Sequence, residues 1–334
     1  MSMKELQYCP SLLTQGFNSY SPAALRRLFQ GKRVSHILAY DAPQKNEADT
    51  EKFMENRKRI SISGVQEKFS MILQKNQLRL TEPGEQGLYI VKPIPRDLKK
   101  VNQLPANEHL TMQIAAQVYG IHTAACAMIF FKNGDPAYIT LRFDVKEDGS
   151  KWGAEDFATL AGKTSDNAGP NFKYDYSYEE IGALIRKYVP AWRIEMEKYF
   201  LVVVFNYLFS NGDAHLKNFS LLESESGDYF LSPAYDLVNT RIHVDDTDFA
   251  LDKGLFADEF RSATFQKSNH PGKEDFMELS KRLGINKGRA EKLMQPFLIK
   301  QPMVETLTHR SFLNESVKRG YLLDYNNRRN RLNA

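Results

Sequence analysis

The sequence predicts an α+β fold of two unlike lobes, because its first half carries strand patterns and its second half helix patterns. In "FSMIL", Phe69, Met71 and Leu73 fall on one face of an extended chain. The runs "QLRL" and "LYIVKP" follow, separated by turn-forming residues, which indicates an antiparallel meander. A cleft between two unlike lobes is a common place for a ligand.

The stretch "NEHLTMQIAAQVYG" changes to a helical period. Leu110, Ile114 and Val118 fall on one face of this expected helix. Two further strands are then expected over 125–131 and 137–145.

Helical patterns dominate beyond these strands. "SYEEIGALIRKYV" opens with a capping box formed by Ser177 and Glu180, and "AWRIEMEKYFLVVVFNYLF" is apolar on all sides, as in a buried central helix. A hairpin, "FSLLE" and "YFLS", is expected after it. We therefore expect an N-terminal segment of helices and turns over 1–54, a β-rich nucleotide-binding lobe over 55–143 and an α-helical catalytic lobe over 144–334.

Composition narrows the class of protein. With 45 basic and 41 acidic residues, the net charge of +4 is too small to indicate a nucleic-acid groove, although the basic "NNRRNR" could be a solvated tail or a docking point for an acidic partner. Cys9 and Cys126 lack metal-ligand spacing, so neither a disulfide framework nor a zinc site is expected. The apolar run "LVVVFNYLF" is too short to cross a bilayer, and the start lacks signal-peptide character. We expect a cytoplasmic protein with no membrane association.

The stretch "FSNGDAHLKNFSLL" contains polar residues that could take part in catalysis. Asp213 and Asn218 lie five positions apart, and Asp236 in "YDL" follows on the far side of the expected hairpin. Phosphoryl transfer needs this order: one Asp orients or deprotonates the acceptor hydroxyl, while the Asn and the second Asp hold Mg²⁺. Because the transition state is loose and charged, catalysis is mostly positioning and electrostatic stabilisation.

The β-rich lobe contains a lysine that could contact the phosphates in such a reaction. "YIVK" ends a strand at Lys92, as the phosphate-contacting lysine of kinases ends its strand, and Glu108 near the next helix could hold its ammonium. In the alternative interpretation, Lys92 is solvated and Glu108 serves the helix dipole. The other motifs favour the functional role for Lys92, and the role of Glu108 stays open.

A loop before the second strand could cover the phosphates. Ser61, Ser63 and Gly64 are small enough for a close backbone approach, with Val65 beside them, but one glycine is far from a glycine-rich motif. Its position between the first strands, rather than its pattern, makes it a candidate nucleotide contact.

Five further residues are candidate nucleotide contacts. His215 could bond a phosphate oxygen and Lys217 could neutralise the transferring group, although both could simply face solvent. At the lobe junction, "LRFDV" offers backbone groups of Leu141 and Phe143 for adenine and Asp144 for the ribose, unless it is an ordinary strand end.

In order and spacing these motifs resemble the HipA family of bacterial toxin serine/threonine kinases. The resemblance rests on "SGVQEKFSMIL", "YIVKP", "NEHLTMQIAAQVYGI", "LRFD", "NGDAHLKNFSLL" and "LSPAYDL", which span 60–240. The chain looks most like the short HipT branch, because little sequence precedes the phosphate loop, where HipA carries an additional subdomain. The resemblance implies a two-lobed protein-kinase-like fold that uses ATP and Mg²⁺. It implies Asp213 as catalytic base, Asn218 and Asp236 as Mg²⁺ ligands and Lys92 on the ATP phosphates.

The resemblance also implies regulation, targets and partners. Ser61 and Ser63 match the S-x-S pair that is autophosphorylated in HipT, and a phosphoserine carries nearly two negative charges, so it would repel ATP from this loop. The implied substrate is an aminoacyl-tRNA synthetase, tryptophanyl or glutamyl. The implied partners are a HipB-like DNA-binding antitoxin and a small HipS-like antitoxin.

Two other classes of function remain possible from the sequence. The loop "NGDAHLKN" is also similar to that of aminoglycoside and choline kinases, which would make the chain a small-molecule phosphotransferase. Such an enzyme has no reason to carry regulatory serines in its phosphate loop. A binding protein without catalysis is the third class, and the full set of catalytic residue types argues against it.

Overall fold

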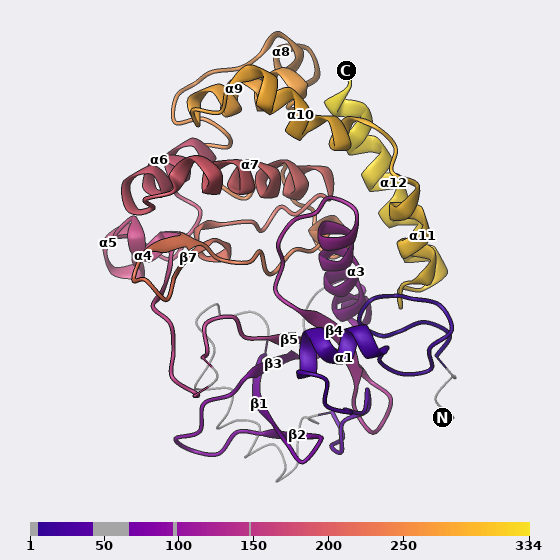
Figure 1. Cartoon of the computed structure of the whole chain (residues 1–334). Helices are drawn as coiled ribbons and strands as arrows, with labels where there is room; N and C mark the ends of the chain where they lie inside the picture. Colours follow the sequence, from indigo (N-terminus) through magenta and orange to yellow (C-terminus); the bar gives the residue numbers. More distant parts are fainter. Residues whose placement is uncertain (1–5, 43–66, 96–98, 147) are drawn as a thin grey trace. The chain divides into compact units, whose positions relative to one another are not determined.

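The computed structural model describes residues 6–42, 67–95, 99–146 and 148–334 (Figure 1). The chain divides into two compact units. The β-rich unit comprises Met1–Gln113, Ala124–Lys151 and Thr306–Lys318, and the helical unit comprises Ile114–Thr123, Trp152–Glu305 and Arg319–Ala334. The segment boundaries predicted from the sequence stay a prediction.

The β-rich unit is built on an antiparallel sheet of five strands in the order β2-β1-β3-β5-β4. The strands are β1 (Phe69–Gln74), β2 (Gln77–Leu80), β3 (Tyr89–Lys92), β4 (Cys126–Phe130) and β5 (Pro136–Leu141) (Figure 1). The first three are the meander that the alternating runs predict. In the register between β3 and β5, Lys92 lies opposite Tyr138.

Helix α1 (Pro22–Phe29) supplies part of the core of this unit. Ser21 caps it, since its side chain accepts a hydrogen bond from the backbone N–H of Ala24. The ring of Phe29 is fully buried, and its centroid lies 5.5 Å from that of Tyr89 in β3. Helix and sheet thus share one aromatic core.

A short turn, η1 (Val101–Gln103), leads into helix α3 (Leu104–Gln117). The helix begins three residues earlier than the motif "NEHLTMQIAAQVYG" indicates, which places Glu108 in its second turn. Side chains are buried on nearly every face of α3 up to Ala115, polar ones included. Burying a polar group costs free energy unless it has a hydrogen-bond partner, so the buried polar side chains of this helix are possible partners for other buried polar or charged groups.

The helical unit is organised around α7 (Trp192–Leu208), which packs against α6 (Tyr178–Tyr188), α10 (Lys287–Leu298) and β8 (Tyr229–Leu231). The predicted capping box of α6 is present: the Ser177 N–H donates to Glu180 Oε2 over 2.8 Å, and the Glu180 N–H donates to Ser177 Oγ over 3.2 Å. The second half of α7 is buried almost entirely, as its apolar sequence predicts.

A three-stranded antiparallel sheet, β6-β7-β8, belongs to the same unit. Strands β7 (Ser220–Glu223) and β8 (Tyr229–Leu231) form the predicted hairpin. Strand β6 (Ala154–Asp156) adds to it and was not predicted, because three residues are too few to show a period.

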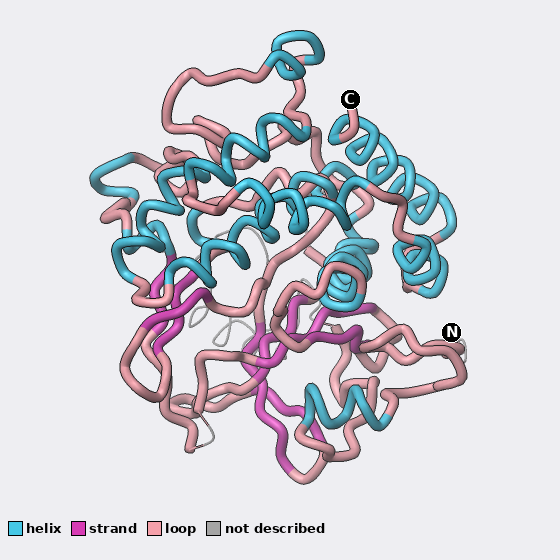
Figure 2. The backbone as a smooth tube through the Cα atoms, turned by 45° about the horizontal axis from the view of Figure 1, so that its top comes forward, coloured by secondary structure: helices cyan, strands magenta, loops and turns pink. Residues whose placement is uncertain are grey.

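Further helical elements complete the part of the chain that the structure describes (Figure 2). They are α4 (Phe157–Leu160), α5 (Ser165–Ala168), η2 (Leu216–Asn218), η3 (Thr240–Ile242), α8 (Ala263–Ser268), α9 (Lys273–Arg282), α10 (Lys287–Leu298), α11 (Pro302–Arg310) and α12 (Glu315–Leu332). Within the described ranges, no helix combines the length and the apolar character needed to cross a membrane.

Two isoleucines of the α6–α7 pair allow a matched test of this packing. Ile185 is fully buried, whereas Ile194 is 63% exposed. Ile185→Ala should lower the free energy of unfolding by roughly 2–5 kcal/mol through lost burial and a residual cavity. Ile194→Ala should change it by less than about 0.5 kcal/mol. Urea unfolding of both variants checks this, and equal losses would contradict the packing described here.

Candidate active site

In the β-rich unit, Lys92 forms a buried ion pair with Glu108. The Lys92 Nζ atom lies 2.6 Å from Glu108 Oε1, and both side chains are 4% exposed. The same ammonium lies 5.3 Å from the centroid of the Tyr138 ring. Burying an unpaired charge costs free energy, so the Glu108 carboxylate of α3 stabilises the Lys92 ammonium at the end of β3. The ion pair favours the functional interpretation of Glu108.

In the helical unit, Thr240 fixes the loop that follows α7. Its N–H and its hydroxyl donate to the carbonyl oxygen of Ser210 over 3.1 and 2.9 Å, and the hydroxyl accepts from the N–H of Gly212 over 2.8 Å. Ser210 has a left-handed backbone, φ 53°. Such a conformation in a non-glycine residue persists where its surroundings determine it.

The same loop is also bonded to the last long helix. Arg328 of α12 is 2% exposed and donates from Nε to Ser210 Oγ over 3.2 Å. Its guanidinium pairs with Asp248 and lies 4.8 Å from the centroid of the Tyr207 ring. The start of the loop is thus held from two directions.

Asp213 presents its carboxylate on this loop. Its side chain is 54% exposed, and Oδ1 accepts a hydrogen bond of 2.9 Å from the hydroxyl of Tyr174. An exposed carboxylate within a fixed loop is able to accept a proton from an incoming hydroxyl.

The side chain of Asn211 joins the two predicted aspartate positions. Asn211 Oδ1 accepts from the N–H of Asp213 over 3.3 Å, and Nδ2 donates to the carbonyl oxygen of Asp236 over 3.4 Å. Asp236 itself has a left-handed backbone, φ 56°. One amide therefore brings together residues that lie 23 positions apart in the sequence (236 − 213).

Asn218, at the end of η2, offers a free ligand atom. Its Oδ1 is buried and has no hydrogen-bond partner within the described residues. Among those residues no group of three His, Cys, Asp or Glu side chains could hold a metal ion by itself. An amide and a carboxylate suit Mg²⁺, which takes its other oxygen ligands from phosphate and water. The orphaned Oδ1 therefore fits such an ion.

His215 is buried beside Asp213 in its neutral form. It is 3% exposed, its Nδ1 has no partner within the described residues, and its Nε2 lies 3.8 Å from Asp213 Oδ1. Burial lowers the pKa of the imidazole to about 4, although Asp213 opposes the shift. Near pH 7 it can therefore act as a neutral hydrogen-bonding group but not as a cation.

Lys217 is engaged by a carboxylate that the sequence did not reveal. Its Nζ lies 2.6 Å from Asp156 Oδ2, at the end of β6. Asp156 also caps α4, because its Oδ1 accepts from the N–H of Thr159. Lys217 thus lies within the loop, and its ammonium is already paired with the Asp156 carboxylate.

The predicted hinge residues lie at the end of β5. The N–H of Leu141 donates to the carbonyl oxygen of Ala125, so this N–H is already used within the sheet. Phe143 is half-buried. Burial favours the neutral form of Asp144, but Arg142, at 2.9 and 2.5 Å, holds the pKa of this carboxyl below its ordinary value. The candidate loop residues outside the described ranges are Ser61, Ser63, Gly64 and Val65.

Asp246 lies against Gly212 in the loop that follows α7, and the sequence did not predict it. A Cβ atom at Gly212 would lie 2.5 Å from Asp246 Cβ, so only glycine fits there. Asp246 Oδ2 has no hydrogen-bond partner within the described residues, and burial, with Asp213 adding to it, raises the pKa of this carboxyl. Asp246 also lines a cavity of about 480 Å³ formed by 241–275.

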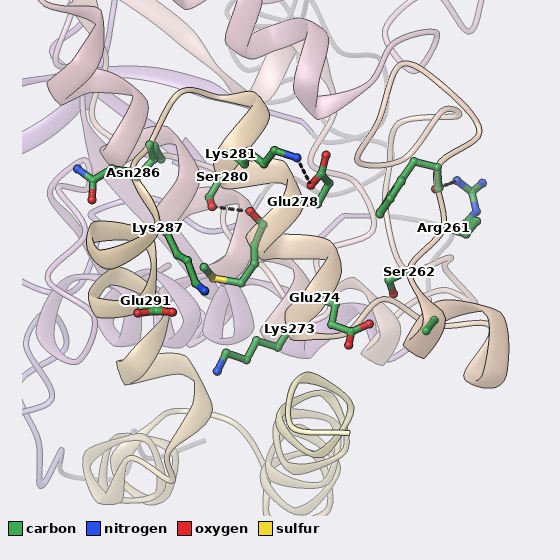
Figure 3. Close-up of a pocket in the computed structure, with 14 residues that line it drawn as sticks. Arg261, Ser262, Lys273, Glu274, Glu278, Ser280, Lys281, Asn286, Lys287 and Glu291 are labelled. Carbon is green, nitrogen blue, oxygen red and sulfur yellow. Dashed lines mark hydrogen bonds and ion pairs between the residues drawn. The ribbon is translucent and has the colours of Figure 1, made fainter.

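A second cavity, of about 720 Å³, lies between α8, α9 and α10. Figure 3 shows Lys273 of α9 and Lys287 of α10 extending toward the same opening. None of the predicted site residues lines it.

The five-stranded sheet and the helical unit make a protein-kinase-like fold. The model of the family described as HipA-like C-terminal domain matches residues 60–303. The chain therefore belongs to this family.

Two proteins named as kinases are similar to this chain in sequence. A Haemophilus influenzae protein named "Putative kinase" is 26% identical over 329 residues, 92% of each chain. The Sinorhizobium fredii protein named "Putative kinase Y4dM" is 30% identical over 225 residues, 63% of this chain and 52% of that protein.

Solved structures confirm the α+β, protein-kinase-like fold. HipA, from the Shewanella oneidensis MR-1 complex of HipA, HipB and operator DNA, matches with a TM-score of 0.61 and 19% identity over 87% of this chain and 72% of that one. The Helicobacter pylori proinflammatory kinase CtkA matches with a TM-score of 0.50 and 15% identity over 78% of this chain and 93% of that one.

The buried ion pair makes a prediction about stability. Glu108→Gln keeps the volume of the side chain but removes the charge that faces Lys92, so the free energy of unfolding should fall by roughly 3–5 kcal/mol. The matched control is Glu85→Gln, which breaks the half-exposed pair with Arg79 and should cost much less. Chemical denaturation distinguishes them, and similar losses would show that Glu108 does not stabilise the Lys92 ammonium.

Two of the buried imidazoles, those of His109 and His215, predict a loss of stability on acidification. Burial lowers the pKa of His109 and of His215 to about 4, from an ordinary value of 6.5. Between pH 6.5 and 4 the unfolded chain binds more protons, so stability should fall as the pH falls through this range. Urea midpoints at several pH values measure the slope, and His109→Gln and His215→Gln should each reduce it. If the variants show the same dependence of stability on pH as the wild type, the two imidazoles are not buried in their neutral form.

Proposed function

We propose that the chain is a serine/threonine protein kinase that uses ATP and Mg²⁺ and acts in the cytoplasm as the toxin of a toxin–antitoxin pair. Its proposed substrate is an aminoacyl-tRNA synthetase, whose modification would halt translation. Family membership supports kinase chemistry, and the resemblance of the motifs to the HipT branch supports the rest.

One observation carries the catalytic part of the proposal. An exposed carboxylate, Asp213, stands five positions before a buried amide oxygen of Asn218 that has no hydrogen-bond partner within the described residues. A structural loop has no reason to bury such an atom, because an unsatisfied acceptor is costly. A metal-binding loop does have a reason.

The proposed roles follow from the chemistry of each group. Asp213 accepts the proton of the acceptor hydroxyl while the hydroxyl oxygen bonds to the γ-phosphorus and the bond to the β–γ bridging oxygen breaks, releasing ADP. Asn218 and Asp236 would hold Mg²⁺, which neutralises charge on the phosphate oxygens when bound. Lys92, held by Glu108, would contact the phosphates of ATP.

The remaining predicted residues are proposed to contact the phosphates, the adenine or the ribose of ATP. Neutral His215 would donate a hydrogen bond to a phosphate oxygen, and Lys217 would need to leave Asp156, or share it, to do the same. The backbone groups of Leu141 and Phe143 would contact adenine. Asp144 would reach the ribose only if its pairing with Arg142 permits.

Regulation and partners extend the proposal. Ser61 and Ser63, with Gly64 and Val65 beside them, would cover the ATP phosphates, and phosphorylation of either serine would repel ATP. HipA of Shewanella oneidensis is found with HipB and operator DNA. By analogy, we propose a HipB-like antitoxin and a small HipS-like antitoxin as partners of this chain.

Incubation with labelled ATP and Mg²⁺ tests the function. We expect label on Ser61 or Ser63 by phosphopeptide mapping, and on tryptophanyl- or glutamyl-tRNA synthetase when either is added. Asp213→Asn should lower the transfer rate roughly 10²–10⁴-fold, because it removes the base and keeps the volume, with nucleotide affinity near that of the wild type. The control is Asp228→Asn, an exposed aspartate in the β7–β8 turn, which should retain full activity.

Other outcomes would refute the proposal in distinct ways. Transfer only to aminoglycosides or choline would make the chain a small-molecule phosphotransferase. A chain that does not bind ATP would be a binding protein. Full transfer by Asp213→Asn would assign the base elsewhere.

A further inference from the structure

Tyr174 makes a contact with the base that the catalytic motif does not contain. It lies between α5 and α6, and its hydroxyl donates to Asp213 Oδ1 over 2.9 Å. None of the hydrogen bonds within the described residues uses Asp213 Oδ2, and the side chain of Asp213 is 54% exposed. One oxygen of the carboxylate is therefore held by a hydrogen bond, and the other is not.

The backbone around Tyr174 is fixed from both sides. Its carbonyl oxygen accepts from the N–H of Asp252 over 2.9 Å, and its own N–H donates to the carbonyl oxygen of Asn171 over 2.9 Å. The carbonyl oxygen of the preceding Lys173 accepts from the N–H of Leu216, in the catalytic loop, over 3.1 Å. The hydroxyl is thus presented by backbone that is bonded to the same loop as its acceptor.

The ring of Tyr174 is held as well. It meets the buried imidazole of His215 edge to face at a centroid distance of 5.3 Å, and Lys173 Nζ lies 4.9 Å from its centroid. Edge-to-face pairs favour one relative orientation. The imidazole therefore restricts how the ring can turn, and with it the direction in which the hydroxyl points.

The Tyr174 hydroxyl keeps its proton, as a hydrogen-bond donor to Asp213 must. Burial raises the pKa of its hydroxyl, and the carboxylates of Asp213, Asp246 and Asp252 raise it further. The hydroxyl stays protonated, so it can give a hydrogen bond to Asp213 but cannot replace it as base.

We propose that Tyr174 is a positioning residue for this base: it fixes the Asp213 carboxylate through Oδ1 and leaves Oδ2 to receive the proton of the acceptor hydroxyl. The inference rests on the proposed function, because it takes Asp213 to be the base. Without the tyrosine, an exposed carboxylate could rotate, and only part of its population would be aligned with the acceptor.

The test is Tyr174→Phe, which removes only the hydroxyl. We expect kcat to fall roughly tenfold or more, the scale of one hydrogen bond to a charged group, while KM for ATP and the thermal midpoint stay near their wild-type values. The control is Tyr176→Phe in the same segment, whose ring lies near Lys163 and Lys253 and should leave kcat unchanged. An unchanged kcat in Tyr174→Phe would overturn the inference.

A second measurement separates positioning from a general structural effect. In single-turnover experiments, Tyr174→Phe should have no further effect in the Asp213→Asn background, because the hydroxyl acts only through the carboxylate. An equal fold loss in both backgrounds would mean that the tyrosine supports the fold instead, and would overturn the inference. A wild-type chain that transfers no phosphate would overturn the proposed function itself, whereas an active wild type with an insensitive Tyr174 would overturn only the positioning role.

Discussion

The side chain of Thr240 holds the turn at the start of the loop that follows α7. Its hydroxyl donates to the carbonyl oxygen of Ser210 and accepts from the N–H of Gly212, so one oxygen atom satisfies backbone groups on both sides of a tight turn. Loop backbone near the interior must have its polar groups paired. Once this turn is set, the carboxylate of Asp213 and the amide of Asn218 have defined places.

The candidate residues of the two units fall into two electrostatic kinds. The cations proposed for phosphate, Lys92 and Lys217, are each paired with a carboxylate at 2.6 Å. In contrast, Asn218 Oδ1 and Asp246 Oδ2 lack hydrogen-bond partners within the described ranges. Pairing orients the two lysine side chains before a ligand arrives, and a buried oxygen without a hydrogen-bond partner is an acceptor for positive charge that a ligand brings.

The sequence predicted what short-range periodicity and spacing encode. The alternation around Phe69 and the capping box at Ser177 gave the sheet and α6, whereas the three residues of β6 carried no detectable period. The spacing of Asp213, Asn218 and Asp236 identified a candidate loop, and their catalytic roles stay a prediction.

What the sequence could not provide is contacts across long separations. Tyr174 lies 39 positions from Asp213 and Asp156 lies 61 from Lys217, and no local pattern distinguishes either from an ordinary loop residue. Such pairs are determined by the path of the whole chain, which a single sequence does not reveal. The orphaned oxygen of Asn218 is equally invisible, because being without a partner depends on every neighbour.

The bond from Arg328 to Ser210 spans 118 positions of the chain. A ribosome has therefore translated α7 and the loop after it well before the guanidinium that steadies Ser210 emerges from the exit tunnel. During that interval the loop lacks one of its restraints. Synthesis thus delays the finished loop until α12, near the end of the helical unit, has left the ribosome.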